Sequence, residues 1–177
     1  MHRLFVGLRP PPAIRDALGA VMRGVERARW QDDGQLHLTL RYIGEVERPV
    51  AEDVAEALLG IAFAPITLTL AGVGQFTTRG RVNSLWAGVS PHDALTRLHL
   101  KIDRALVRIG LPPEGRAYLP HITLARMSGG AGPIDGFLAC NAALASPLFT
   151  LDHFLLFESH LGRDGSRYEA IARYPLK

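Results

Sequence analysis

Hydrophobic and polar residues alternate along several short stretches of the chain, and two of these stretches are alike. Residues 36–46 read LHLTLRYIGEV and residues 120–128 read PHITLARMS, with apolar residues at every second position. A period of two is typical of a strand with one buried face. Helix-like stretches follow each of them, and the glycine-bearing segments 77–83 and 161–167 predict hairpins. The pattern therefore predicts an α+β protein.

The order of these elements repeats once along the chain. The stretch LFVGLRPPPAIRDAL begins at Leu4, and the similar stretch LWAGVSPHDALTRL begins at Leu85, 81 residues later. The histidines of the two alternating strands, His37 and His121, are 84 residues apart. Because several elements recur in register, we predict an internal duplication.

A duplicated chain predicts a bilobal fold. We expect one domain over residues 1–177, with pseudo-repeat lobes of roughly residues 1–81 and 82–177. The fold would contain two mainly antiparallel sheets with helices outside, because the leucines of the alternating strands would pack under helices. The two lobes would face each other across a central cleft that carries the two His-x-Thr-x motifs.

Each alternating strand carries a histidine and a threonine on its polar face. Residues i and i+2 of a strand point to the same side, roughly 6.5–7 Å apart, so His37 lies beside Thr39 and His121 beside Thr123. A single strand histidine is usually a structural or surface residue, and threonine is simply a good strand former. Two copies at equivalent positions of a duplicated chain instead favour a shared function.

Two imidazoles and two hydroxyls suit the chemistry of a phosphodiester. Free imidazole titrates near pH 6.5, so one ring can be a general base while the other is a general acid. The threonines would hold the non-bridging oxygens, and a cation should stabilise the transition state. Arg126 is the leading candidate, but it needs a twist or bulge, since it would point away from His121 in a regular strand. Arg41 is the second candidate: it lies on the His37 face, or it is a solvated charge at the strand edge.

The composition is that of a globular protein with no implied cofactor. Hydrophobic residues make up 47% of the chain and charged residues 21%, and the net charge is +3, which permits a phosphate-bearing ligand. No apolar run approaches the roughly 20 residues of a membrane span. The motifs H-E-x-x-H and C-x-x-C and the P-loop are absent, so we expect no metal. The one cysteine, Cys140, is expected to be buried in a helix, and the expected location is cytoplasmic.

The chain resembles the 2H phosphoesterase superfamily, and within it the bacterial RNA 2′,3′-cyclic phosphodiesterases, also called 2′-5′ RNA ligases. The stretches RLFVGLRPP, HLTLRYIGEV, LWAGV, PHITLAR and FESHLGRDGSRYEAIARYPL carry the resemblance over almost the whole chain. It implies metal-independent hydrolysis of RNA 2′,3′-cyclic phosphate ends, tRNA fragments among them, to 2′-phosphates, with reverse 2′-5′ ligation as a minor activity. It also implies that His37 is the proton donor to the leaving 3′ oxygen, that His121 accepts a proton from water, and that Thr39 and Thr123 bind the phosphate.

The contacts beyond the phosphate stay open at this level. Tyr42 stands where the family often has phenylalanine, which keeps a stacking ring, whereas stacking of a base on Trp86 or Phe5 competes with core packing. Arg79 and Arg81 would track an RNA backbone or simply be solvated turn residues. The alternatives to an RNA phosphodiesterase are an enzyme for small cyclic nucleotides or other nucleotide-derived cyclic phosphates, and a non-catalytic RNA-end binder. Neither a membrane nor an obligate protein partner is expected.

Overall fold

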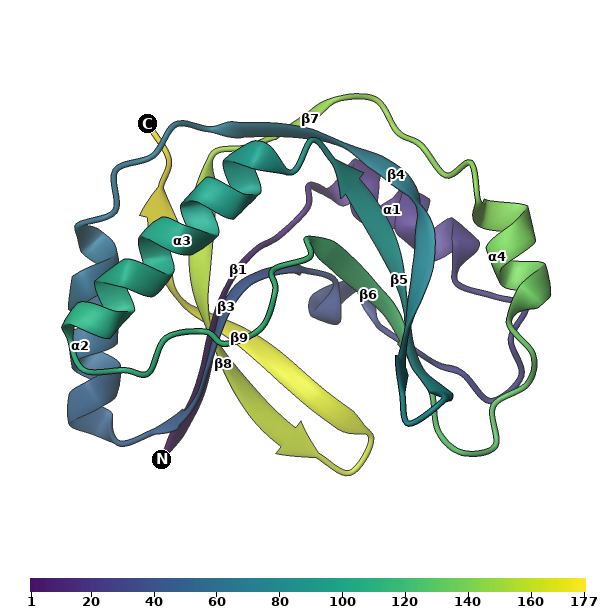
Figure 1. Ribbon diagram of the computed structural model, residues 1–177, viewed down its shortest axis with the longest axis horizontal. Helices are drawn as coiled ribbons and strands as arrows, with labels where there is room; N and C mark the ends of the chain where they lie inside the picture. Colours follow the sequence, from purple (N-terminus) through teal and green to yellow (C-terminus); the bar gives the residue numbers. More distant parts are fainter.

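A computed structural model describes all 177 residues, Met1–Lys177. The chain forms an arch whose two arms end in β-hairpins (Figure 1). The strands are β1 (His2–Leu8), β2 (Arg29–Trp30), β3 (Leu38–Val46), β4 (Ile66–Thr78), β5 (Arg81–Ser90), β6 (His121–Arg126), β7 (Phe149–Leu151), β8 (His153–Gly162) and β9 (Gly165–Pro175). The helices are α1 (Pro12–Val21), α2 (Arg48–Leu59), α3 (Asp93–Arg108) and α4 (Asp135–Asn141), with a 3₁₀ turn over Asp33–Gln35.

The strands form one antiparallel sheet that is joined at its centre by a single residue pair. The strand order is β7-β4-β5-β6-β3-β1-β8-β9, and the short β2 pairs with β6. Strands β3 and β6 meet only through Leu38 and Ile122. The sheet therefore consists of a first half, β3-β1-β8-β9, and a second half, β6-β5-β4-β7. The prediction of a mainly antiparallel α+β fold with helices outside is confirmed, and the two predicted sheets are the two halves of one sheet.

The two half-sheets do not coincide with the two segments of the predicted repeat. The first half combines β1 and β3 from residues 1–81 with β8 and β9 from residues 82–177, and the second combines β4 with β5, β6 and β7. The boundary near residue 81 lies in the β4–β5 hairpin, within one half-sheet. Residues 1–81 and 82–177 are therefore segments of the sequence and not separate lobes in space.

The helices cover the outer side of the arch, with α2 and α3 on one arm and α1 and α4 on the other (Figure 1). Helix α3 buries Leu95, Leu98, Ile102 and Leu106, whose spacing of three or four residues places them on one face. This face packs against the core side of β3. The polar side of β3 therefore faces away from α3, toward the inside of the arch.

Helix α4 is shorter than the sequence predicts. It spans seven residues and buries Phe137, while the side chain of Cys140 is exposed. The expectation of a buried cysteine is therefore wrong, because so short a helix packs few of its side chains. No helix of the protein is long and apolar enough to cross a membrane.

A β-bulge interrupts β6 directly after its threonine. Opposite β5, the register passes from Thr123 to Ala125 and leaves Leu124 outside the pairing. An extra residue in one strand reverses the alternation beyond it, and accordingly Leu124 and Ala125 are both buried. Arg126 therefore returns to the side of the strand that carries His121.

Strand β3 contains the same bulge 84 residues earlier. Opposite β1, its register passes from Thr39 to Arg41 and leaves Leu40 outside the pairing. Leu40 and Arg41 are both buried, and Tyr42 is half exposed on the side of His37. Equivalent bulges in β3 and β6 support the duplication more specifically than the motifs do.

Candidate active site

The two histidines lie where β3 and β6 meet. His37 immediately precedes β3, and His121 is the first residue of β6. In the antiparallel register of the β3–β6 pair, His37 lies opposite Thr123, and Thr39 lies opposite His121. The two residues of that pair are buried in the core, so the four polar side chains share the other face. The structure thus brings the two motifs together in one square of side chains.

Both imidazoles are held by the same hydrogen bond. Nδ1 of His37 lies 2.7 Å from the carbonyl oxygen of Gln35, and Nδ1 of His121 lies 2.7 Å from that of Leu119. A carbonyl oxygen only accepts, so Nδ1 carries the proton in each ring. Nε2 of each ring is then left to exchange a proton with a ligand. Nε2 of His37 is 3.1 Å from Oγ1 of Thr39.

Three aromatic rings enclose His37. Its ring centroid lies 4.7 Å from that of Phe5, 5.1 Å from that of Tyr168, which meets it edge-on, and 5.9 Å from that of Phe157. Phe5 is only 4% exposed and stacks on Phe157. Of the two roles that the sequence left open for Phe5, base stacking and core packing, this packing is the second.

Two aromatic rings flank His121. Phe76 meets it edge-on with a centroid separation of 4.8 Å, and Trp86 lies at 6.1 Å. Phe76 and Phe157 are again 81 residues apart, and each lies beside the histidine of the other repeat segment. Trp86 also packs on Gly74, where an added Cβ would lie 2.3 Å from the indole. This contact holds the Trp86 ring beside His121.

Burial and a nearby cation lower the pKa of both histidines. The pKa of His37 lies at about 4, because the ring is buried and because Arg126 and His121 add positive charge. Burial and Arg126 also lower the pKa of His121. The hydrogen bonds to the two carbonyl groups act in the opposite direction. Both rings are therefore more easily deprotonated than free imidazole.

Arg126 and Tyr42 both lie on the histidine side of the arch. They line a cavity of about 570 Å³ that also contains Thr39 and His121. Strand β6 contains the bulge that Arg126 requires to reach this side. The positive charge of Arg126 lowers the pKa of both imidazoles. Tyr42 occupies the position of β3 that corresponds to Arg126 in β6.

Arg41 borders the cavity, but its guanidinium turns away from the face of His37, and the sequence prediction is wrong on this point. Its Nε donates to Asp103 at 2.6 Å, and its other nitrogens donate to the carbonyl groups of Tyr42 and Pro112. Its side chain is 7% exposed. The bulge at Leu40 turns Arg41 toward α3, so all of these donors are used within the protein.

The two arginines of the β4–β5 turn lie apart from the histidine cavity. Arg79 is exposed in the turn with φ +52°. Arg81 lines a different hollow, next to Asn83 and Asp135. The structure therefore does not bring them to the four motif side chains.

Among the cavity residues that sequence reasoning missed are Arg116, Tyr118 and His99. The Tyr118 hydroxyl donates to the carbonyl oxygen of Thr39 at 3.0 Å, and Nδ1 of His99 donates to that of Leu40 at 2.6 Å. The rings of His99 and Tyr118 stack with centroids 4.2 Å apart. These bonds satisfy carbonyl groups at the bulge of β3. No motif marks the three residues, because their role depends on where α3 and the 109–120 segment lie relative to β3.

The arrangement suits proton transfer at a phosphate. Two nitrogen atoms free for proton exchange and two hydroxyl groups lie on one face of the β3–β6 pair, and Thr39, His121 and Arg126 line one cavity there. No group of three or more His, Cys, Asp or Glu side chains that could hold a metal ion occurs in the structure.

Known proteins match this chain in sequence and structure. The model of the LigT-like phosphoesterase family matches residues 8–86 and 88–168. An Escherichia coli RNA 2′,3′-cyclic phosphodiesterase is 31% identical over 182 residues, which cover 99% of this chain and 97% of that protein. A Geobacillus stearothermophilus RNA 2′,3′-cyclic phosphodiesterase is 30% identical over 149 residues, but this chain spans only about half of its length, 47%.

The fold agrees with these matches. The crystal structure of E. coli LigT complexed with 3′-AMP superposes with a TM-score of 0.78 at 26% identity, covering 99% of this chain and 98% of that one. The family model accounts for both motif strands and for most of the chain. The chain belongs to the LigT-like phosphoesterases.

Proposed function

We propose that the protein is an RNA 2′,3′-cyclic phosphodiesterase that opens the cyclic phosphate to a 2′-phosphomonoester without a metal. The observation that carries this proposal is the β3–β6 register, which sets each histidine opposite the threonine of the other motif. A tetrahedral phosphate in this square has a proton-exchanging nitrogen on either side. The names of the relatives in E. coli and G. stearothermophilus support the substrate class.

In the proposed reaction, His121 and His37 act on opposite sides of the phosphorus. Nε2 of His121 accepts a proton from water as the water oxygen bonds to phosphorus. The bond from phosphorus to the 3′ oxygen breaks, and protonated Nε2 of His37 donates its proton to that oxygen. Thr39, Thr123 and Arg126 hold the non-bridging oxygens and balance their charge.

This mechanism needs one proton on the histidine pair. The low pKa of His37 opposes its protonation in the free protein, and Arg126 contributes to this effect. A bound phosphodiester anion offsets the charge of Arg126 and raises the pKa of both histidines. The substrate therefore helps to create the protonation state that its own cleavage requires.

The same site supports ligation in principle, because a hydroxyl group can attack the phosphorus with His121 as the base and His37 as the acid. A 5′-hydroxyl takes the place of water, and a 2′-5′ bond forms. We propose this ligation as a minor activity. We also place the protein in the cytoplasm, in keeping with its single cysteine.

A second candidate is a phosphodiesterase for nucleoside cyclic phosphates. The cavity volume of about 570 Å³ is of the size that small ligands occupy, and the E. coli relative was crystallised with 3′-AMP. The two candidates share one mechanism and differ in substrate length.

The test compares a short RNA ending in a 2′,3′-cyclic phosphate with a nucleoside 2′,3′-cyclic phosphate, both in excess EDTA. We expect 2′-phosphate from the RNA at the higher kcat/KM. A preference for the nucleotide would favour the second candidate. Binding of the RNA without turnover would make the protein an RNA-end binder.

A further inference from the structure

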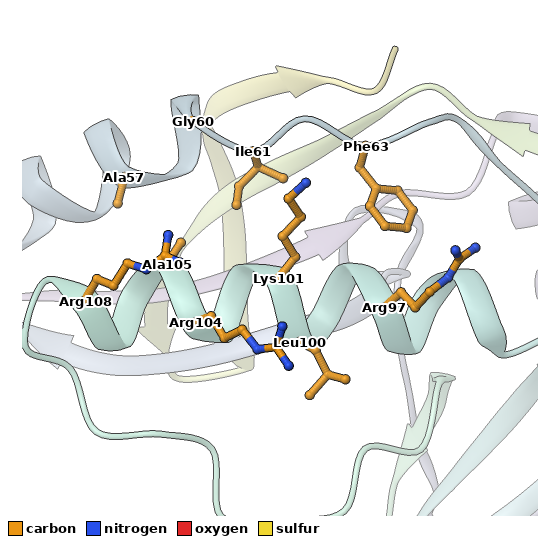
Figure 2. Close-up of a pocket in the computed structure, with 10 residues that line it drawn as sticks. All are labelled: Ala57, Gly60, Ile61, Phe63, Arg97, Leu100, Lys101, Arg104, Ala105 and Arg108. Carbon is orange, nitrogen blue, oxygen red and sulfur yellow. The ribbon is translucent and has the colours of Figure 1, made fainter.

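A groove separates α2 and α3 on the outside of the first half-sheet (Figure 2). Its volume is about 610 Å³, and five of its ten lining residues are hydrophobic. Ile61 and Phe63 point toward α3 from the segment that follows α2 (Figure 2). The groove therefore combines a concave shape with an apolar floor.

Four cations of α3 line this groove, namely Arg97, Lys101, Arg104 and Arg108. They are spaced by three or four residues, about one helical turn each, so the row is about 16 Å long. None of the four forms an ion pair. The acidic residues of α2 do not line the groove. A row of uncompensated positive charge favours a polyanionic ligand.

Two of these cations are held at the groove by specific contacts. Nζ of Lys101 donates to the carbonyl oxygen of Ala62 at 2.6 Å. The guanidinium carbon of Arg97 lies 5.8 Å from the centre of the Phe63 ring. Aromatic rings and guanidinium planes are the surfaces on which unpaired bases of RNA stack.

Helix α3 forms a wall of both the groove and the histidine cavity. His99 lines the cavity, and the neighbouring Leu100 and Lys101 line the groove. The two hollows are therefore about one helix diameter apart, roughly 10–12 Å. Arg116, on the segment that joins α3 to β6, adds a cation on the cavity side.

We propose that this groove binds the phosphate backbone of the RNA substrate a few nucleotides 5′ of its cyclic end. The inference rests on the proposed function, because the cyclic end must lie in the histidine cavity. The concave shape and the ring of Phe63 fit a single strand of nucleotides better than a flat lipid surface. The groove would then contribute to affinity for long RNA and not to the chemical step.

The experiment compares the wild type with the triple variant Arg97→Gln, Arg104→Gln, Arg108→Gln. The control is Arg23→Gln, Arg27→Gln, Arg48→Gln, which removes the same charge from exposed residues outside the groove. Each protein is assayed with a dinucleotide and with a 20-nucleotide single strand, both ending in a 2′,3′-cyclic phosphate. Turnover of the dinucleotide also reports that the variants fold.

For the groove variant we expect an unchanged kcat/KM for the dinucleotide and a KM for the long RNA that rises on the order of tenfold. The slope of log KM against log salt concentration should fall by about 2, since each phosphate contact on a single strand contributes about 0.7. The control variant should match the wild type.

An unchanged KM and salt slope for the long RNA, with normal turnover of the dinucleotide, would overturn the groove assignment alone. Loss of binding to anionic lipid vesicles with unchanged kinetics on RNA would overturn it in favour of a membrane surface. If the wild type hydrolyses neither substrate, the proposed function itself is wrong, and the groove assignment is overturned with it.

Discussion

At the scale of single residues, the two histidines are matched in their hydrogen bonds but differ in their surroundings. Each ring donates from Nδ1 to a carbonyl oxygen two residues earlier, so in both rings Nε2 is the nitrogen left for proton exchange. His37 contacts three aromatic rings and His121 contacts two. Because the hydrogen bonds are equivalent, the roles of acid and base depend on how the substrate lies between them.

Replacing either His37 or His121 by alanine should lower kcat by about 10²–10⁴-fold, because each removes one step of proton transfer. The control is His153→Ala, since His153 hydrogen-bonds to Asp152 and does not line the cavity. Steady-state kinetics on a cyclic-phosphate RNA and a thermal melt of each variant check this expectation. A His121→Ala protein with a near-normal rate would contradict the mechanism.

Arg126 should set the position of the pH profile. Both histidine pKa values are lowered from 6.5, so kcat/KM of the wild type should peak below pH 6.5, where the free pair holds one proton. Replacing Arg126 by glutamine removes a positive charge that opposes protonation. We therefore expect a lower rate and a maximum at higher pH.

Arg116→Gln is the matched control for this profile. Arg116 lines the same cavity but is not among the charges that lower either pKa. Its replacement should leave the pH of the maximum unchanged. An Arg126→Gln profile that stays in place or moves to lower pH would contradict the electrostatic role of Arg126.

At the scale of elements, the sequence predicts the strands of the motifs but not how their polar faces continue. Alternation places His121 and Thr123 on one face, as observed. It places Arg41 on the face of His37, which is wrong because of the bulge at Leu40. In β6 the adjacent apolar pair Leu124 and Ala125 hints at a break in the alternation. In β3 the residue that corresponds to Ala125 is the buried Arg41, so no pair of adjacent apolar residues marks the bulge.

The ion pair between Arg41 and Asp103 should stabilise the bulge of β3. Burial opposes ionisation of Asp103, but the hydrogen bonds from Arg41 and from the backbone of Glu114 keep its pKa below the ordinary value. Asp103→Asn leaves the buried Arg41 without this partner, and we expect a loss of about 3 kcal/mol in the free energy of unfolding. Urea denaturation measures it.

Asp53→Asn is the control for this prediction, because Asp53 is exposed on α2. Its effect should stay within about 0.5 kcal/mol. Equal stability of the two variants would show that the pair does not hold the bulge.

At the scale of the whole molecule, the duplication is visible in the sequence, but the exchange of strands is not. The order of elements predicts which segments are alike, and it does not specify which strands pair across the repeat. The pairing of β1 with β8 joins residues 148 to 154 positions apart. Hydrophobic burial on both segments drives this pairing, and no local pattern encodes it.

The interleaved half-sheets predict that neither repeat segment folds alone. A fragment of residues 1–81 would keep β1 and β3 without β8 and β9, and β4 without β5, and would expose residues that belong to the shared core. We expect a fragment without a cooperative thermal transition by circular dichroism. A cooperative transition of the isolated fragment would show that the repeats are independent units.

The central claim is that His37 supplies a proton to the 3′ leaving atom and His121 removes one from water. The most direct measurement uses a cyclic substrate in which sulfur replaces the bridging 3′ oxygen, because a thiolate leaves without a proton donor. With this substrate the His37→Ala variant should regain a rate near that of the wild type, whereas the His121→Ala variant should remain slow. Recovery of His121→Ala instead would reverse the two roles, and recovery of neither would contradict the two-histidine mechanism.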